Sequence, residues 1–274
     1  TEMVKKSAVD DVAVFKQLME LGFDALNLTK HRMQGIWQLQ YNPLRSLRPS
    51  RNADRKFATI REAFDGKSFN FNKPFLQKEI FWQGEISSRN VKLLYNKFPF
   101  ARLHGLLVIE PDANKPQLLE KADHELVWQF LHTAGQHLPM GMGYNSLGAY
   151  ASVNHQHFQS FVSKKKYPVE LACWEHNGGS MHFPLACRKF IQADEAWEYL
   201  QTLHQADLPY NLLYRSGEMY CISRSFQGSY KHSDWTGGFA WSEISGSIAT
   251  TSQSDFEALD TAAIEAEMMK LRRA

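Results

Sequence analysis

The stretch GYNSLGAYASVNHQHFQSFVS, residues 143–163, carries the most informative pattern in this sequence. We expect extended structure here, and side chains on a strand alternate between its two faces. One face would then present three polar groups in a row, namely His155, His157 and Gln159. The opposite face would present Gln156, Phe158 and Ser160.

The residues just before the histidines favour phosphate binding. They form a loop rich in glycine, asparagine and serine, where backbone N–H groups and small side chains let phosphate oxygens come close. The side chains offered for this contact are Asn145, Ser146, Ser152 and Asn154.

The histidine pair suits nucleophilic attack at phosphorus. A neutral imidazole is competent near neutral pH, because its unperturbed pKa is about 6.5. The attacking nitrogen has to be unprotonated, so the other ring nitrogen should donate to a fixed acceptor such as a backbone carbonyl. Gln159, unlike a third histidine, supplies hydrogen bonds but no proton. This favours a leaving group that needs no proton, such as a sugar phosphate, and transfer to phosphate over hydrolysis.

Other interpretations fit this stretch less well. A lone HxH is most often a pair of histidines whose hydrogen bonds are satisfied inside a sheet. Here the loop that precedes the pair favours a catalytic role instead. A zinc site would need further ligands, and the sequence has no CxxC pair and no HExxH. The spacings GxGxxG and GxxxxGK[ST] are also absent, which excludes Rossmann and P-loop binding. We therefore expect no metal and no cofactor.

The composition sets the class of protein. The 274 residues are 43% hydrophobic and 22% charged, which suits a globular chain with a buried core. A net charge of +2 gives no electrostatic case for nucleic-acid binding. The three sparse cysteines fit a reducing compartment, and neither a signal segment nor an apolar run of membrane-spanning length is evident. We therefore expect a cytoplasmic protein that binds no nucleic acid and no membrane.

Periodicity along the chain predicts a mixed α+β fold rather than alternating βαβ units. Helices are expected over 10–21, 115–138 and 194–205, and after a capping sequence at 254–257. Strands are expected over 34–41, 79–83, 91–95, 104–110, 210–215, 218–223 and 238–249. Between the first two strands, an arginine-bearing polar segment reads as a loop or arm.

The run from Tyr144 to Gln159 resembles the histidine-triad superfamily, in its transferase branch. Galactose-1-phosphate uridylyltransferase and the diadenosine tetraphosphate phosphorylases share the HxHxQ ending. The resemblance is closer to the GDP-galactose and GDP-glucose phosphorylases, whose motif looks like YNSLGA(F/Y)A(S/T)xNHxHFQ. Segments that resemble the same family, in the same order, are 42–49, 64–73, 208–224 and 239–246.

The resemblance implies a histidine-triad-like antiparallel sheet with packed helices, built from two halves of which the second is degenerate. The N-terminal arm and the catalytic half would occupy residues 1–190. The degenerate half and a C-terminal helix would occupy residues 191–274. Two such halves pack as a pseudo-dimer with one active site, so a monomer would suffice, and a homodimer is compatible with this arrangement.

The resemblance also implies roles for single residues. His157 matches the nucleotidylated histidine, His155 its supporting partner, and Gln159 the phosphate donor. The residues implied to contact phosphate are Asn145, Ser152 and, from the polar arm, Arg45. The zinc ligands of the uridylyltransferases are missing, which argues against a metal.

The implied activity is phosphorolysis of a GDP-hexose, giving GDP and hexose 1-phosphate through a guanylyl-His157 intermediate. The alternatives are phosphorolysis of dinucleoside polyphosphates, another nucleotide-sugar nucleotidyl transfer, and a nucleotide-binding sensor without turnover. The intact set of two histidines and Gln159 argues against the sensor, because a pure binder needs no nucleophile. The sequence does not identify the base or the hexose of the substrate.

Two further features have two interpretations each. His104, just before an apolar strand, could line the nucleotide pocket or be a hydrogen-bonded histidine at the strand edge. The aromatic residues Trp235, Phe239 and Trp241 could stack on a base, but packing in the core is favoured.

Overall fold

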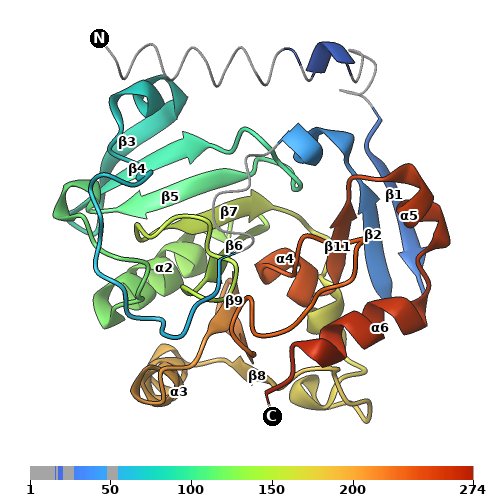
Figure 1. The fold of residues 1–274 in the computed structure, drawn as a ribbon. Helices are drawn as coiled ribbons and strands as arrows, with labels where there is room; N and C mark the ends of the chain where they lie inside the picture. Colours follow the sequence, from blue (N-terminus) through green and yellow to red (C-terminus); the bar gives the residue numbers. More distant parts are fainter. Residues whose placement is uncertain (1–15, 17, 21–27, 48–54, 274) are drawn as a thin grey trace.

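The computed structural model describes residues 16, 18–20, 28–47 and 55–273 (Figure 1). Its centre is an eight-stranded sheet in the order β3-β4-β5-β7-β6-β9-β10-β8, each strand antiparallel to its neighbours. In chain order the strands are β3 (Ile80–Ile86), β4 (Arg89–Tyr95), β5 (Gly105–Ile109), β6 (Met140–Asn145), β7 (Phe158–Val162), β8 (Cys187–Phe190), β9 (Tyr210–Arg215) and β10 (Glu218–Ser223). The α+β class with an antiparallel sheet, expected from the sequence, is confirmed.

Helices α2 (Lys121–Ala134) and α3 (Ala193–Gln205) pack on one side of this sheet (Figure 1). Their apolar sides bury a common cluster, in which Leu131 and Leu200 meet Phe158 of β7. Removing that apolar surface from water stabilises the fold by about 25 cal/mol per Å². One face of β7 therefore packs against the helices, and side chains on its other face can contribute to a site.

A smaller sheet of order β1-β2-β11 packs toward the other face of the large sheet. β1 (Lys30–Gln34) and β2 (Trp37–Tyr41) form an antiparallel hairpin, and β11 (Ser247–Thr250) pairs in parallel with β2. Helices α5 (Gln253–Ala258) and α6 (Thr261–Lys270) lie beside this sheet (Figure 1). A second apolar core fills the space between the two sheets.

The hairpin corrects the expectation of a single strand over 34–41. Gly35 has a φ of +58°, a left-handed conformation that glycine adopts without strain, and the chain reverses there. Residues 30–33, which were not expected to be extended, pair with β2 as a result.

The helix expected over 115–138 is shorter, because residues 115–120 are not helical. It begins at Lys121 and ends at Ala134. Pro116 favours extended backbone in the residue before it. Residues 115–117 instead run beside the loop that precedes β7, where the Lys115 carbonyl accepts from the Gln156 N–H at 3.0 Å.

The expectation of continuous extended structure over 143–163 is also corrected. Residues 146–157 form a loop between β6 and β7, so His155 and His157 precede the strand and Gln159 lies in it. The loop can form here because its backbone groups find partners other than a neighbouring strand ladder. The Ser146 N–H donates to the carbonyl of Tyr210, at the start of β9, at 3.0 Å, and the Gln156 N–H donates to the Lys115 carbonyl.

The strand expected over 238–249 is a short helix, α4 (Trp241–Ile244), followed by β11. The carboxylate of Glu243 accepts from the Ala240 N–H at 3.2 Å and so holds the first turn of α4. The next helix is capped two residues earlier than expected, because the hydroxyl of Ser252 accepts from the Asp255 N–H.

The large sheet continues across the division expected at residue 190. β8, from the first part, pairs with β10, and β6 pairs with β9. The assignment of two halves with that boundary stays a prediction. Of the helix expected over 10–21, only residues 16 and 18–20 are described, and these are helical; the rest lies outside the described residues. Among the residues that are described, no helix combines the length and the apolar character needed to cross a bilayer.

Candidate active site

The start of the loop between β6 and β7 is anchored by hydrogen bonds to residues 64 or more positions further along the chain. Asn145 Oδ1 accepts from Asn211 Nδ2 at 2.6 Å and from the backbone N–H of Trp241 at 2.7 Å. The hydroxyl of Ser146 accepts from the Tyr210 N–H at 2.9 Å. Asn145 and Ser146 are both buried, so their side chains shape the loop from within.

His157 ends this loop, with one ring nitrogen facing two oxygens. Its Nδ1 lies 2.8 Å from the His155 carbonyl oxygen and 2.9 Å from Gln117 Oε1. A ring nitrogen between two acceptors has to carry the hydrogen, so Nε2 is the unprotonated nitrogen of the neutral ring. The ring packs against Phe71 with 4.9 Å between centroids. This is the tautomer that a nucleophilic Nε2 requires.

The amide oxygen of Gln159 is held by two neighbouring side chains, Trp241 and His104. Oε1 accepts from the indole N–H of Trp241 at 2.9 Å and lies 3.1 Å from His104 Nε2. Because an indole N–H can only donate, the Gln159 Nε2–H group is the end that can donate to a ligand. Trp241 reaches this position because Gly143 has no side chain, and a Cβ there would lie 2.1 Å from the indole ring.

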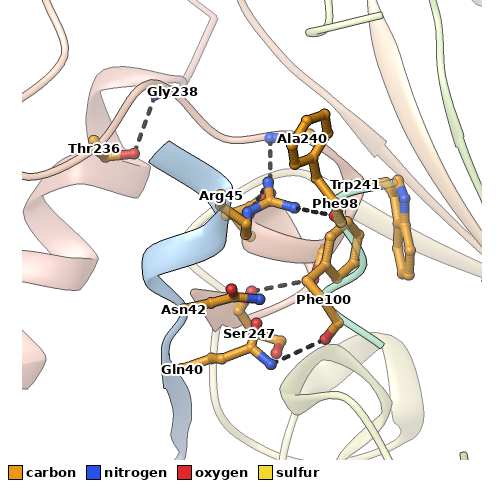
Figure 2. Close-up of polar contacts among 12 residues, drawn as sticks. Gln40, Asn42, Arg45, Phe98, Phe100, Thr236, Gly238, Ala240, Trp241 and Ser247 are labelled. Atoms are coloured by element: carbon orange, nitrogen blue, oxygen red, sulfur yellow. Dashed lines mark hydrogen bonds and ion pairs between the residues drawn. The ribbon is translucent and has the colours of Figure 1, made fainter. Parts of the chain in front are cut away.

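Arg45 enters the site from the 3-10 turn after β2, η2 (Pro43–Leu47), as Figure 2 shows. Its guanidinium carbon lies 4.7 Å from the centroid of the Phe100 ring. Burial lowers the pKa of Arg45, and the charge of Glu243 opposes that shift. The Arg45 Nη2 to Glu243 Oε1 distance is 3.8 Å, a loose ion pair that leaves positive charge to attract an anion.

Arg45 also belongs to a row of side chains that holds the segment Phe98–Phe100 in place (Figure 2). Three successive carbonyls of this segment each accept one hydrogen bond from that row. The pairs are Phe98 with Arg45 (3.5 Å), Pro99 with Asn42 (3.0 Å) and Phe100 with Gln40 (3.1 Å). The ring of Phe100 then packs edge-on against His104, with 4.3 Å between centroids. The segment is thereby fixed as a wall beside Gln159.

These groups surround a cavity of about 120 Å³. Four of the residues expected at the site line it, namely Arg45, Ser152, His157 and Gln159. The other walls are mainly aromatic and aliphatic, with Asn96 and Lys97 as polar exceptions beside Glu79. A guanidinium, an amide donor and an imidazole around one small space can together hold and attack a phosphate group.

The remaining residues expected at the site are Asn145, Ser146, Asn154 and His155, whose side chains do not line this cavity. Asn154 Oδ1 accepts from the backbone N–H of Gln117 at 2.9 Å. His155 Nδ1 accepts from the Phe71 N–H at 3.1 Å. These side chains hold the segments that surround the site, and their direct contact with substrate stays a prediction.

The ring of His155 is neutral and should make folding sensitive to acid. Burial, assisted by the charge of Lys92 and opposed by the Pro111 carbonyl, lowers the pKa of His155 from 6.5 to about 4. Between these values the unfolded chain binds a proton that the folded chain does not. The free energy of unfolding should therefore fall as pH decreases from 6.5 to 4, by up to about 1.4 kcal/mol per pH unit for this residue.

Urea unfolding between pH 4.5 and 7 measures that slope. The His155→Asn variant keeps an acceptor for the Phe71 N–H and has no imidazole to protonate. We expect its slope to be smaller than that of the unchanged protein. His204, whose pKa is also lowered to about 4, mainly by burial, contributes equally to both proteins. Equal slopes would contradict a neutral, buried His155.

Gln117 was not identified as functional from the sequence, and Trp241 and His104 were each left with two interpretations. Gln117 lay within a helical pattern, and only its distance to His157 in the fold reveals it. Trp241 is packed in the core as expected, and it also donates to Gln159. His104 is buried and hydrogen-bonded, but it sits against Gln159 and not merely at a strand edge. No three His, Cys, Asp or Glu side chains in the described part of the chain converge on a possible metal position.

Known proteins that are similar to this chain are named phosphorylases. A family model described as GDPGP1-like, N-terminal domain, matches residues 21–161. GDP-D-glucose phosphorylase 1 of Homo sapiens is 31% identical over 188 residues, covering 62% of this chain and 47% of the human protein. GDP-L-galactose phosphorylase 1 of Arabidopsis thaliana is 30% identical over 131 residues, covering 41% and 29%. The chain thus spans about half the length of the human relative, and less of the plant one.

Among solved structures, yeast Ap4A phosphorylase Apa2 in complex with Ap4A superposes with a TM-score of 0.59. The two chains are 17% identical, and the match covers 90% of each. At that identity the likeness establishes a common fold. The family match over half of the chain places this protein in the GDPGP1-like family.

Proposed function

We propose that the protein is a GDP-hexose phosphorylase that works through a guanylyl-histidine. The observation that carries this proposal is the environment of His157. Two oxygens face its Nδ1, and its ring lines a cavity shared with Arg45 and Gln159. The named relatives are GDP-D-glucose and GDP-L-galactose phosphorylases, which supports GDP-hexose as the substrate class.

In the first half-reaction, Nε2 of His157 attacks the α-phosphorus of the GDP-hexose. The bond from that phosphorus to the oxygen of the hexose 1-phosphate breaks, and hexose 1-phosphate leaves with the electron pair. This leaving group is a stable phosphate anion and needs no proton, which agrees with a glutamine at position 159. Arg45 and Gln159 would stabilise the negative charge on the phosphoryl oxygens.

In the second half-reaction, an oxygen of inorganic phosphate attacks the same phosphorus. The P–N bond to His157 breaks, GDP forms, and the ring returns to its starting tautomer. Phosphate arrives as an anion at physiological pH, so its attack requires no general base. The positive charge of Arg45 would favour its entry over that of water.

A panel assay tests the substrate class. GDP-glucose, GDP-galactose, ADP-glucose, UDP-glucose and Ap4A are each incubated with phosphate, and the nucleotide products are separated by chromatography. We expect GDP and hexose 1-phosphate from the GDP-sugars, with the other substrates at least tenfold slower. Faster cleavage of Ap4A would identify a dinucleoside polyphosphate phosphorylase, and binding without any turnover would identify a sensor.

Activity should withstand removal of metal ions. The proposed chemistry uses an imidazole, a guanidinium and an amide, none of which needs a bound ion. We expect the rate of GDP formation to stay within about twofold after treatment with EDTA and dialysis. Loss of activity that zinc specifically restores would contradict this mechanism.

We also propose that one chain forms a complete site, since the four lining residues named above come from a single chain. We propose in addition that the chain consists of a catalytic half and a degenerate half. We also propose a cytoplasmic location. Three free cysteines are compatible with a reducing compartment. Specific activity that is constant on dilution across the range where a dimer would dissociate would support the monomer.

A further inference from the structure

Gln117 lies against the nucleophile although it belongs to no motif. It sits between Pro116 and the start of α2, and 1% of its surface is exposed. Its backbone N–H donates to Asn154 Oδ1, which sets the position of its side chain. The extended backbone before α2 therefore delivers an amide group to the inside of the β6–β7 loop.

The orientation of this amide is determined by its neighbours. Gln117 Nε2 donates to the Asn145 carbonyl at 2.9 Å and to the His157 carbonyl at 3.2 Å. Gln117 Oε1 accepts from the His157 backbone N–H at 2.9 Å. Carbonyl oxygens can only accept and a backbone N–H can only donate, so turning the amide over would break all three contacts.

This orientation has a consequence for the imidazole. Gln117 Oε1 also lies 2.9 Å from Nδ1 of His157, on a ring that the His155 carbonyl approaches at 2.8 Å. A lone pair on Nδ1 would face two oxygen lone pairs in a buried place, which is strongly unfavourable. We propose that Gln117 is a positioning residue that holds His157 in the Nδ1–H tautomer; the use of that tautomer for attack at phosphorus rests on the proposed function.

A neutral amide suits both states of the reaction. Before attack, it accepts the Nδ1 hydrogen without drawing a second proton onto the ring. After attack at Nε2, the ring of the intermediate is positively charged, and the same oxygen faces that charge. A carboxylate in this place would stabilise imidazolium in the resting protein, so that Nε2 would be protonated and unable to attack.

Nitrogen NMR of ¹⁵N-histidine-labelled protein tests the tautomer without any substrate, so the outcome is independent of the proposed function. The His157 signals are assigned by comparison with His157→Ala. At pH 7.5 we expect Nδ1 to be the protonated nitrogen in the unchanged protein. In Gln117→Met, which removes one of the two acceptors and leaves the His155 carbonyl, we expect a measurable share of the Nε2–H tautomer beside the Nδ1–H form. Protonation at Nε2 in the unchanged protein, or an unchanged pattern in Gln117→Met, would overturn the inference.

Gln156→Met is a matched control. Gln156 is equally buried and adjacent to His157 in the chain, but its amide donates to Asp123 Oδ2 on the other side of the sheet. Its loss removes a buried amide hydrogen bond of similar kind without touching the imidazole. We expect the His157 signals of this variant to match those of the unchanged protein.

Gln117→Glu tests the same inference through pH. It keeps the shape of the side chain but loses the N–H donors to the Asn145 and His157 carbonyls, so thermal unfolding is measured beside it to show that the variant is folded. Ionisation of the new carboxyl beside Nδ1 should hold a proton on His157. The acid limb of the kcat/KM profile should therefore move upward by one pH unit or more. A uniformly reduced profile with an unmoved acid limb would show a purely structural role and overturn the proposal. Absence of turnover in the unchanged protein would instead contradict the proposed function, leaving the NMR result to decide the tautomer.

Discussion

Replacement of His157 by alanine is expected to lower turnover of a GDP-hexose by several orders of magnitude. No other group in the described part of the cavity offers a nitrogen suited to this attack. Arg45 is cationic, the amide of Gln159 is not nucleophilic, and the amine of Lys97 forms an ion pair with Glu79 at 2.9 Å. The unchanged protein, mixed briefly with GDP-hexose in the absence of phosphate, should gain the mass of one guanylyl group. The adduct should be acid-labile, and addition of phosphate should release it as GDP.

Intact-mass spectrometry under rapid quenching makes the measurement. His155→Asn is the control, since it changes the neighbouring histidine but keeps the backbone carbonyl that faces Nδ1 of His157. We expect this variant to gain the same mass and His157→Ala to gain none. Turnover by the unchanged protein without any adduct would replace the double displacement with direct attack by phosphate.

The second large effect is expected at Gln159. Its Nε2–H group should donate to a phosphoryl oxygen whose charge and geometry change as His157 attacks. Loss of one preorganised donor of this kind typically lowers kcat by about 10²–10³. Gln159→Ala should show that decrease with little change in KM, because the interaction is strongest in the transition state.

Two further variants test separately how Gln159 is oriented and whether a group at this position can transfer a proton. Trp241→Phe keeps the aromatic ring over Gly143 but removes the indole donor, so it should lower kcat in the same direction by a smaller factor. Gln159→His introduces a group that can transfer a proton, which should raise the ratio of GMP to GDP at fixed phosphate. An unchanged ratio together with unchanged kcat in both Gln159 variants would mean that this side chain does not face the reacting phosphate.

The sequence was sufficient for the central part of the site because that part is local. His157 and Gln159 are two residues apart, and both line the cavity even though only Gln159 belongs to a regular strand. The expected alternation holds from His157 to Gln159, whereas the side chain of His155 does not line the cavity. Phe158, between them, packs under the helices as expected. A period of two is visible in a single sequence wherever one face of a strand is buried.

The supporting groups could not be predicted because they are set by distant contacts. Gln117 lies in the segment expected as a helix, and the backbone hydrogen bond that diverts this segment runs from the Gln156 N–H to the Lys115 carbonyl, 41 residues apart. The aromatic and β-branched residues of 238–249 resemble a strand. They form a helical turn because the Glu243 carboxylate caps it while Trp241 is buried against Gly143. Tertiary burial here outweighs local propensity.

The pairing of β6 with β9 limits how the chain can be divided and when its site can form. A fragment ending at residue 161, where the family match ends, would contain both His157 and Gln159. It would also expose the backbone N–H and C=O groups of β6 along an open edge, where further chains can pair and aggregate. During synthesis the loop between β6 and β7 emerges well before Asn211 and Trp241, which anchor it. His157 therefore acquires its final surroundings only after the chain as far as Trp241 has left the ribosome.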